Sequence, residues 1–169
     1  MLDSEDRVST TIRIERATAA DVPLIIALIR ELAEYEHLAP QMSATEDVLR
    51  ASLFGPRPAA EVLIAYANDE PAGMAIFFQN FSSFLGVAGL YLEDLFVRPV
   101  WRRHGIGRLL LKELAKIAVA RGCGRVEWAV LDWNEPAIRF YKTLGARAMD
   151  EWTVFRLTGE PMRRLATAP

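Results

Sequence analysis

The chain has 169 residues, of which 51% are hydrophobic, and this is enough to bury the core of one compact domain. Its formal net charge is -2, so the surface as a whole offers no electrostatic attraction for nucleic acid or for an anionic membrane. The one cysteine, Cys123, excludes an internal disulfide framework. These values favour a small molecule as the partner.

The N-terminal residues 1–11 are polar and are expected to be frayed, and they contain no apolar segment like that of a secretory signal. No uninterrupted apolar run approaches the ~20 residues of a membrane span. We therefore expect a cytoplasmic protein with no membrane partner and with one domain over residues 12–169.

Residues 12–16 alternate apolar and charged side chains, which predicts a half-buried strand. Thr18 or Asp21 is placed to cap a helix that ends around Tyr35 to His37, because its apolar residues recur at steps of three and four. A capping-box spacing from Ser43 to Glu46 predicts a second, short helix. That helix covers residues 45–53, and it is followed by strands over residues 61–67, 72–81 and 88–98, of which the first two form an antiparallel hairpin.

The next predicted helix, residues 105–121, has its apolar side chains on one stripe and ends at Gly122, which suits a left-handed C-cap. A strand over residues 125–131, a helix over 134–144 and a last strand over 152–157 follow. This order of elements predicts a mixed α/β sheet covered by helices.

The segment Arg102-Arg103-His104-Gly105-Ile106-Gly107 stands between a predicted strand and the predicted helix from residue 105. Free backbone N–H groups and the positive end of the helix dipole converge there, and the glycines let the backbone approach an anion closely. Local positive charge comes from four arginines: Arg98, Arg102, Arg103 and Arg108. The alternative is a glycine-containing turn with solvated arginines. Neither a Walker loop nor a dinucleotide fingerprint fits the spacing.

This segment resembles the signature of the GCN5-related N-acetyltransferase (GNAT) superfamily, Arg/Gln-x-x-Gly-x-Gly/Ala at the head of the helix after the fourth strand. The resemblance extends from Ile12 to about Leu165 and is closer still to the diamine (spermidine/spermine) acetyltransferases. Three further stretches carry it: residues 31–36, 91–97 and 133–142. It implies a GNAT fold with a mixed, mostly antiparallel sheet of six to seven strands, splayed between strands 4 and 5, and about four flanking helices.

The resemblance implies acetyl-CoA as co-substrate. No metal is expected, because His37 and His104 have no Cys or carboxylate at ligand spacing. The diphosphate of acetyl-CoA would be held by residues 102–108, namely Arg102, Arg103, His104, Gly105, Ile106, Gly107 and Arg108. The backbone of Leu95, Phe96 and Val97 would pair with the pantetheine arm, because peptide-like amides need partners when buried. Asn134 would contact the cofactor, and Tyr141 would direct its hydroxyl to the thioester sulfur as the acid.

Alternatives remain for the residues of the last predicted helix. Asn134, with Pro136 in the first turn, suits a helix cap that has no ligand. Tyr141, beside Phe140, suits an amphipathic tyrosine of the core.

A base is required because a primary amine has a pKa of ~10 and attacks only when neutral. Glu93 lies in an apolar strand, where desolvation would raise its pKa, and Asp94 is expected on the opposite face by strand alternation. The alternative is one carboxylate in solvent and the other paired with an arginine. By resemblance Glu93 is the base, Asp94 a second acidic group, and Tyr35 and Glu36 contact the cationic substrate.

The sequence departs from the polyamine enzymes in the segment Asn80 to Gly86, which has no acidic residue before the fourth strand. A shorter amine, a diamine or a lysine-like amino acid, is therefore as plausible as a polyamine. The predicted function is acetyl transfer from acetyl-CoA to a primary amine of such a small cation, by direct attack in a ternary complex. The alternatives are a peptide N-acetyltransferase and an acyl-CoA-binding module without catalysis.

Dimerisation is also implied by the resemblance, through the predicted strand at residues 152–157 and the tail from Met162 to Leu165. The alternative is a monomer that keeps this strand in its own sheet.

Overall fold

The computed structural model describes residues 10–168, so the predicted tail lies largely outside the described residues. The chain divides into two compact units, Met1–Ala129 and Val130–Pro169. Thr11, from the end of the predicted tail, is held at the start of the first unit. Its backbone N–H donates to Asn68 Oδ1 at 3.0 Å, and its carbonyl accepts from the Asn68 N–H at 2.9 Å.

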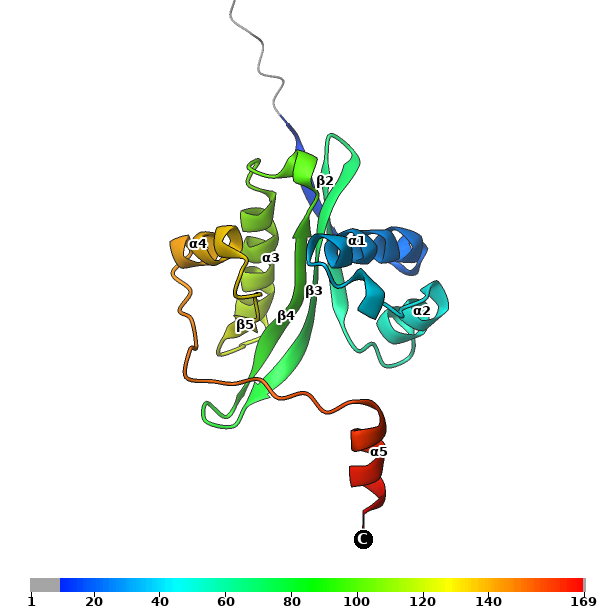
Figure 1. Ribbon diagram of the computed structural model, residues 1–169. Coiled ribbons are helices and arrows are strands. Elements are labelled where there is room, and N and C mark those ends of the chain that lie inside the picture. Colours follow the sequence, from blue (N-terminus) through cyan, green and yellow to red (C-terminus); the bar gives the residue numbers. More distant parts are fainter. Residues whose placement is uncertain (1–9, 169) are drawn as a thin grey trace, which may run out of the picture. The chain divides into compact units, whose positions relative to one another are not determined.

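The first unit contains a sheet of five strands in the order of the sequence (Figure 1). Neighbouring strands are antiparallel except the last pair, β4 and β5, which is parallel. The expected count of six to seven strands was therefore too high for the described residues, although the mixed, mostly antiparallel type is confirmed. The strands are β1 (Ile12–Arg16), β2 (Glu61–Ala67), β3 (Glu70–Ser82), β4 (Val87–Val97) and β5 (Val126–Trp128).

The hairpin between β2 and β3 is closed by the two residues Asn68 and Asp69, whose φ angles are 49° and 65°. Two consecutive positive φ angles are typical of a type I′ turn, which matches the twist of antiparallel strands. Asn and Asp tolerate this conformation, so the turn fixes the register at the Ala67 and Glu70 pair.

Helices cover both faces of this sheet, with α1 (Val22–Tyr35) and α2 (Glu46–Phe54) on one side and α3 (Ile106–Ala120) on the other (Figure 1). Buried side chains of α1, β2, β3 and β4 form one apolar cluster, which includes Ile25, Met74 and Phe96. Three short 3-10 turns precede α1, α2 and α3: η1 (Ala19–Asp21), η2 (Ala39–Gln41) and η3 (Pro99–Trp101). The predicted helices of this unit are thus confirmed to within a few residues.

The parallel pairing of β4 with β5 covers only Leu90, Tyr91 and Leu92 of β4. Beyond Leu92, β4 continues to Val97, and no described strand pairs with it on that side. The predicted splay between the fourth and fifth strands is therefore present, and it leaves five residues of β4 with one unpaired edge.

The second unit contains two helices, α4 (Glu135–Thr143) and α5 (Gly159–Thr167). The strand predicted at residues 152–157 was wrong, because the backbone there has no regular structure. A strand requires a partner strand, and the described part of this unit contains none. Trp152 is 69% exposed and Phe155 is 92% exposed. None of the described helices combines the length and apolar character that crossing a membrane requires.

Candidate active site

The segment predicted to hold an anion leads from η3 into α3 and has an open helix end. Gly105 is the N-cap of α3, with φ of 79°. The first helical bond runs from the Leu109 N–H to the Gly105 carbonyl at 3.0 Å. The N–H groups of Ile106, Gly107 and Arg108 therefore have no acceptor within the helix. A Cβ on Gly105 would meet no atom within 4 Å, so the space beside the N-cap is open.

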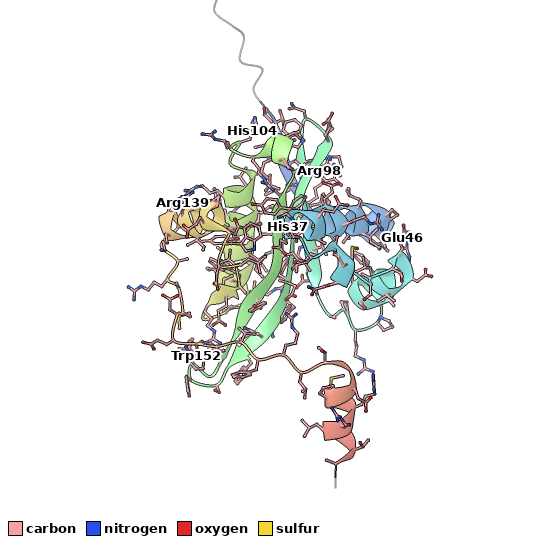
Figure 2. All side chains as sticks on the ribbon, viewed as in Figure 1. His37, Glu46, Arg98, His104, Arg139 and Trp152 are labelled. Carbon is pink, nitrogen blue, oxygen red and sulfur yellow. The ribbon has the colours of Figure 1, made fainter. Side chains whose placement is uncertain are left out.

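This loop, residues 102–108, is referred to below as the cradle. Arg103 adopts φ of 68°, a left-handed conformation that is costly for a residue with a Cβ. His104 is exposed, as Figure 2 shows, and its Nδ1 lies 2.9 Å from the Arg102 carbonyl. The His104 ring also meets the edge of Trp101, with 5.8 Å between ring centroids. These contacts of His104 stabilise the cradle, and the arginines Arg103 and Arg108 of the same loop are exposed.

Arg98, one of the four arginines expected to add charge to the cradle, is engaged by other parts of the protein. Arg98 forms a two-pronged ion pair with Glu31 on α1, with Nη2 to Oε1 at 2.7 Å and Nε to Oε2 at 2.9 Å. Its Nη1 donates to the Pro71 carbonyl at 2.8 Å. The charge of Glu31 therefore offsets the positive charge that Arg98 was expected to add near the cradle.

Arg102 is directed away from the cradle. Its Nε donates to the Val97 carbonyl at 3.0 Å, and its guanidinium carbon lies 4.3 Å from the centroid of the Tyr35 ring. Tyr35 is the last residue of α1 and one of the residues predicted to contact the substrate. The arginine thus joins the end of α1 to the end of β4.

A β-bulge at Glu93 changes the direction of the β4 backbone. Leu92 pairs with Phe77 and Asp94 pairs with the preceding residue of β3, Ile76, so Glu93 is the extra residue. Neighbouring residues of β3 face opposite sides, and Leu92 and Asp94 therefore face opposite sides as well. Strand alternation, from which Asp94 was predicted to lie opposite Glu93, does not hold at this point.

The bulge also decides which peptide groups reach the unpaired edge of β4. The Arg98 N–H donates to the Ala72 carbonyl at the start of β3, so alternation directs the Phe96 peptide groups toward β3 too. A Cβ on Gly73 of β3 would lie 2.3 Å from the Phe96 carbonyl, which agrees with this direction. Leu95 and Val97 present their peptide groups to the other, unpaired edge. Of the three residues expected to direct their peptide groups to this edge, two do so and Phe96 does not.

Two carboxylates, Glu93 and Glu36, act on a third, Asp94, which lies in this part of β4. Asp94 is half-buried, and its pKa is raised to about 6 by desolvation, and further by the charges of Glu93 and Glu36. Desolvation also raises the pKa of Glu36, which caps the end of α1. The structure therefore brings together three of the four residues predicted to bind the substrate, and Tyr35 is next to Glu36 in the chain. These three carboxylates are called the acidic cluster below.

The burial expected of Glu93 is found at Asp94 instead. Glu93 is exposed, and as the extra residue of the bulge it has no paired residue on β3. A pKa near 6 suits a group that takes a proton close to neutral pH, so by burial Asp94 is the better placed of the two.

Asn134 and Tyr141 belong to the second unit and lie at the two ends of α4. Asn134 is the N-cap, and its Oδ1 accepts from the Ala137 N–H at 3.4 Å, so the predicted capping role is confirmed. Tyr141 lies beside Phe140, with 5.4 Å between ring centroids. Contacts of both residues with acetyl-CoA stay predictions. Among residues 10–168, no three His, Cys, Asp or Glu side chains are arranged to hold a metal ion.

The sequence profile of the Acetyltransferase (GNAT) family matches residues 26–146, which include both the cradle and the acidic cluster. The chain belongs to the GNAT family. The resemblance drawn from residues 102–107 is therefore confirmed.

Relatives of this GNAT chain act on amines, according to their names. It is 41% identical to the thialysine N-epsilon-acetyltransferase of Sus scrofa over 92% of this chain and 98% of the relative. It is 35% identical to the L-ornithine N5-acetyltransferase NATA1 of Arabidopsis thaliana, over 90% of this chain and 87% of the relative. Family and relatives together identify an N-acetyltransferase.

The fold agrees with this assignment. The integron cassette protein VCH_CASS6 from the mobile metagenome of V. cholerae superimposes with a TM-score of 0.78 and 28% identity. The alignment covers 95% of this chain and all of that protein. Because the chain belongs to the GNAT family, its five-stranded sheet with the splayed β4 and β5 edge is a GNAT sheet.

Proposed function

We propose that this N-acetyltransferase moves an acetyl group from acetyl-CoA to a primary amine of a small cationic substrate, by direct attack in a ternary complex. The observation that carries the proposal is the position of Asp94 on β4, just after the bulge and next to the unpaired edge. Asp94, with its pKa near 6, directly precedes Leu95, whose peptide groups face the unpaired edge. A proton acceptor and a row of backbone donors and acceptors thus adjoin each other.

The residues present fit coenzyme A at two places. The N–H groups of Ile106, Gly107 and Arg108 and the positive end of α3 suit a diphosphate, with Arg103 and Arg108 adding charge. His104 and Gly105 complete the loop that approaches it. Acetyl-CoA supplies the activated acyl group as a thioester.

The amide-bearing arm of coenzyme A fits the unpaired edge of β4. The peptide groups of Leu95 and the N–H of Val97 are placed to pair with it as a neighbouring strand would, whereas the Val97 carbonyl already accepts from Arg102 Nε. Phe96 anchors this segment in the core. A backbone N–H on this edge is also suited to the thioester carbonyl, where negative charge develops during acyl transfer.

The proton of the attacking amine is assigned to the Glu93 and Asp94 pair. Asp94 is the half-buried member that accepts it near neutral pH, and Glu93 is the exposed member beside it. Tyr141 is assigned to protonate the departing thiolate, since a phenol is a suitable acid for it. Asn134 is assigned a contact with coenzyme A in addition to its role as the N-cap of α4.

The acidic cluster favours a substrate with a compact positive charge, and Tyr35 and Glu36 at the end of α1 would contact it. The relatives named for thialysine and ornithine take amino acids that end in a primary amine. The hairpin segment Asn80 to Gly86 adds no carboxylate, which weakens selection for a long polycation. We therefore rank lysine-like amino acids first, short diamines second and polyamines third.

A homodimer is proposed through the second unit. The irregular segment from residue 152 and the helix α5 expose large apolar side chains that favour burial in an interface: Trp152, Val154, Phe155, Met162 and Leu165. Light scattering on the full chain tests this proposal, and a monomer at micromolar concentration would contradict it. The cytoplasmic location stays a prediction.

An amine panel with acetyl-CoA tests the proposed function, with release of free thiol as the signal. Thialysine, lysine, ornithine, putrescine, spermidine and a lysine-containing peptide are compared at equal concentration. We expect the largest kcat/KM with an amino acid of the first three. Rates at the hydrolysis background for every amine would exclude the enzyme activity, and a preference for the peptide would exclude the small-cation assignment.

A further inference from the structure

Two arginines bracket η3 and both contact α1. Arg98 pairs with Glu31, and Arg102 lies against Tyr35, four residues further along the helix. Residues four apart lie on the same face of a helix, one turn from each other. The segment that leads into the cradle is therefore attached along one face of α1 by two successive contacts. Figure 2 labels Arg98 at the start of this segment.

The second contact joins elements with different tasks. Tyr35 and Glu36 end α1 on the amine side, whereas Arg102 begins the cradle. The Arg102 Nε also occupies the Val97 carbonyl, the last residue of β4, at 3.0 Å. The half-buried Arg102 thus contacts α1 and the end of β4 through its guanidinium, and its backbone is the first residue of the cradle.

We propose that Arg102 is a positioning residue, and that it holds Tyr35 and the end of β4 in place for the amine instead of binding the diphosphate. This inference rests on the proposed function. The guanidinium stacks on a ring, and its Nε–H donates a hydrogen bond to a carbonyl, so its orientation is set by protein groups. The anion-binding task then belongs to backbone amides and to its neighbour Arg103, which is exposed.

The structure predicts a specific kinetic pattern for Arg102→Gln. Loss of the stacked cation removes one contact that orients the Tyr35 ring and so raises the KM for the amine about fivefold, as expected for a cation–π contact of ordinary strength. The Kd for coenzyme A, measured by calorimetry, stays within about twofold of the parent because the backbone donors of α3 are unchanged.

Arg103→Gln is the matched control, since it removes the neighbouring arginine with the same chemical change. It should give the reverse pattern, with a Kd for coenzyme A raised several-fold and an unchanged KM for the amine. If Arg102→Gln instead raises the Kd for coenzyme A tenfold and leaves the amine KM unaltered, Arg102 is a phosphate ligand and the inference is overturned.

Two backgrounds test whether Arg102 acts through the ring of Tyr35. In Tyr35→Phe, which keeps the ring, Arg102→Gln should raise the amine KM by the same factor as in the parent. In Tyr35→Leu, which removes the ring, Arg102→Gln should have little further effect. Equal factors in both backgrounds would contradict the inference, because the arginine would then act independently of the ring.

Thermal unfolding accompanies each kinetic measurement, to exclude a general loss of structure. Arg102→Lys keeps the charge but lacks the Nε donor, and it serves in place of Arg102→Gln if that variant does not fold. The two possible failures are distinguishable. A parent enzyme without turnover on any amine refutes the proposed function, and the coenzyme A titrations still decide whether Arg102 binds the diphosphate.

Discussion

The cradle and the acidic cluster lie in the same unit but are built by different means. The cradle is a continuous segment, and its donors are main-chain groups at a helix end that is set by the φ angles of Arg103 and Gly105. The acidic cluster joins the end of α1 to the middle of β4, and its chemistry comes from the burial of side chains.

This difference determines which changes each site tolerates. A backbone site is insensitive to most side-chain substitutions but sensitive to an added Cβ where a ligand must approach. A cluster of carboxylates responds in the opposite way, because the free energy resides in charge and desolvation. The predictions that follow use variants that should affect one site and leave the other intact.

The largest effect is expected from Asp94→Asn, which removes the half-buried proton acceptor. We expect kcat/KM for the amine to fall about 100-fold, the usual scale of general-base catalysis, with an unchanged Kd for coenzyme A. In the parent, activity should fall as pH drops through about 6, where Asp94 becomes protonated. Glu34→Gln, an exposed change on α1, is the control. Parent-like turnover by Asp94→Asn would remove the residue from the mechanism.

Glu93→Gln separates the members of the pair. The Glu93 charge raises the pKa of Asp94, so its removal should move the acid limb of the pH profile to lower pH. A profile that loses its acid limb altogether would instead identify Glu93 as the group that titrates.

The same Asp94→Asn variant should be more stable than the parent at high pH. A carboxyl whose pKa is raised by folding, here from 3.8 to about 6, destabilises the folded state wherever it must ionise. We expect a gain of about 3 kcal/mol above pH 7 that shrinks between pH 6 and pH 4 and vanishes below both pKa values. Chemical denaturation at pH 8, 6 and 4 measures it.

Glu61→Gln is the control of opposite sign. The pKa of Glu61 is lowered chiefly by its hydrogen bond from Arg121, and Arg16 adds to this, so its charge stabilises the folded protein. This variant should lose stability at pH 8 and approach the parent as pH falls through the lowered pKa. The same sign for both variants would refute the burial argument for Asp94.

Local patterns predicted helices α1 to α4, the hairpin of β2 and β3 and the loop before α3, because each depends on residues close together in the sequence. They did not predict α5. The left-handed Gly122 and Gly145, with φ of 66° and 85°, follow from helix ends alone. The bulge at Glu93 could not be predicted this way, since it exists only in the register between β3 and β4. That one extra residue transferred the expected burial from Glu93 to Asp94.

The contacts of long side chains and the strand at residues 152–157 were also not predicted correctly. Arg98 precedes the cradle and Arg102 begins it, but the side chain of each reaches a residue on α1 more than sixty positions away. The spacing of Glu31 and Tyr35, equal to that of the two arginines, was the available signal. The segment from Trp152 has strand-like side chains, but β-structure depends on a partner that sequence alone does not supply.

A smaller effect is expected from Gly105→Ala, which places a Cβ in the open space beside the N-cap of α3. We expect a Kd for coenzyme A about tenfold weaker, or ~1.4 kcal/mol, and a loss of about 1 kcal/mol of stability from the positive φ. Gly122→Ala, at the other end of α3 with φ of 66° and an equally open Cβ position, should lose the same stability without weakening the binding. Equal binding by the two variants would place the diphosphate elsewhere.

The smallest effect concerns Arg103, whose side chain and backbone make opposite contributions. Arg103→Gly relieves a left-handed φ of 68° and should stabilise the fold by about 1 kcal/mol. It also removes an exposed charge beside the cradle, so the Kd for coenzyme A should rise about threefold, and less at high salt. Asp69→Gly relieves a similar φ of 65° in the β2–β3 turn and should leave that Kd unchanged. If Arg103→Gly binds coenzyme A as tightly as Asp69→Gly does, the anion is held by backbone donors alone.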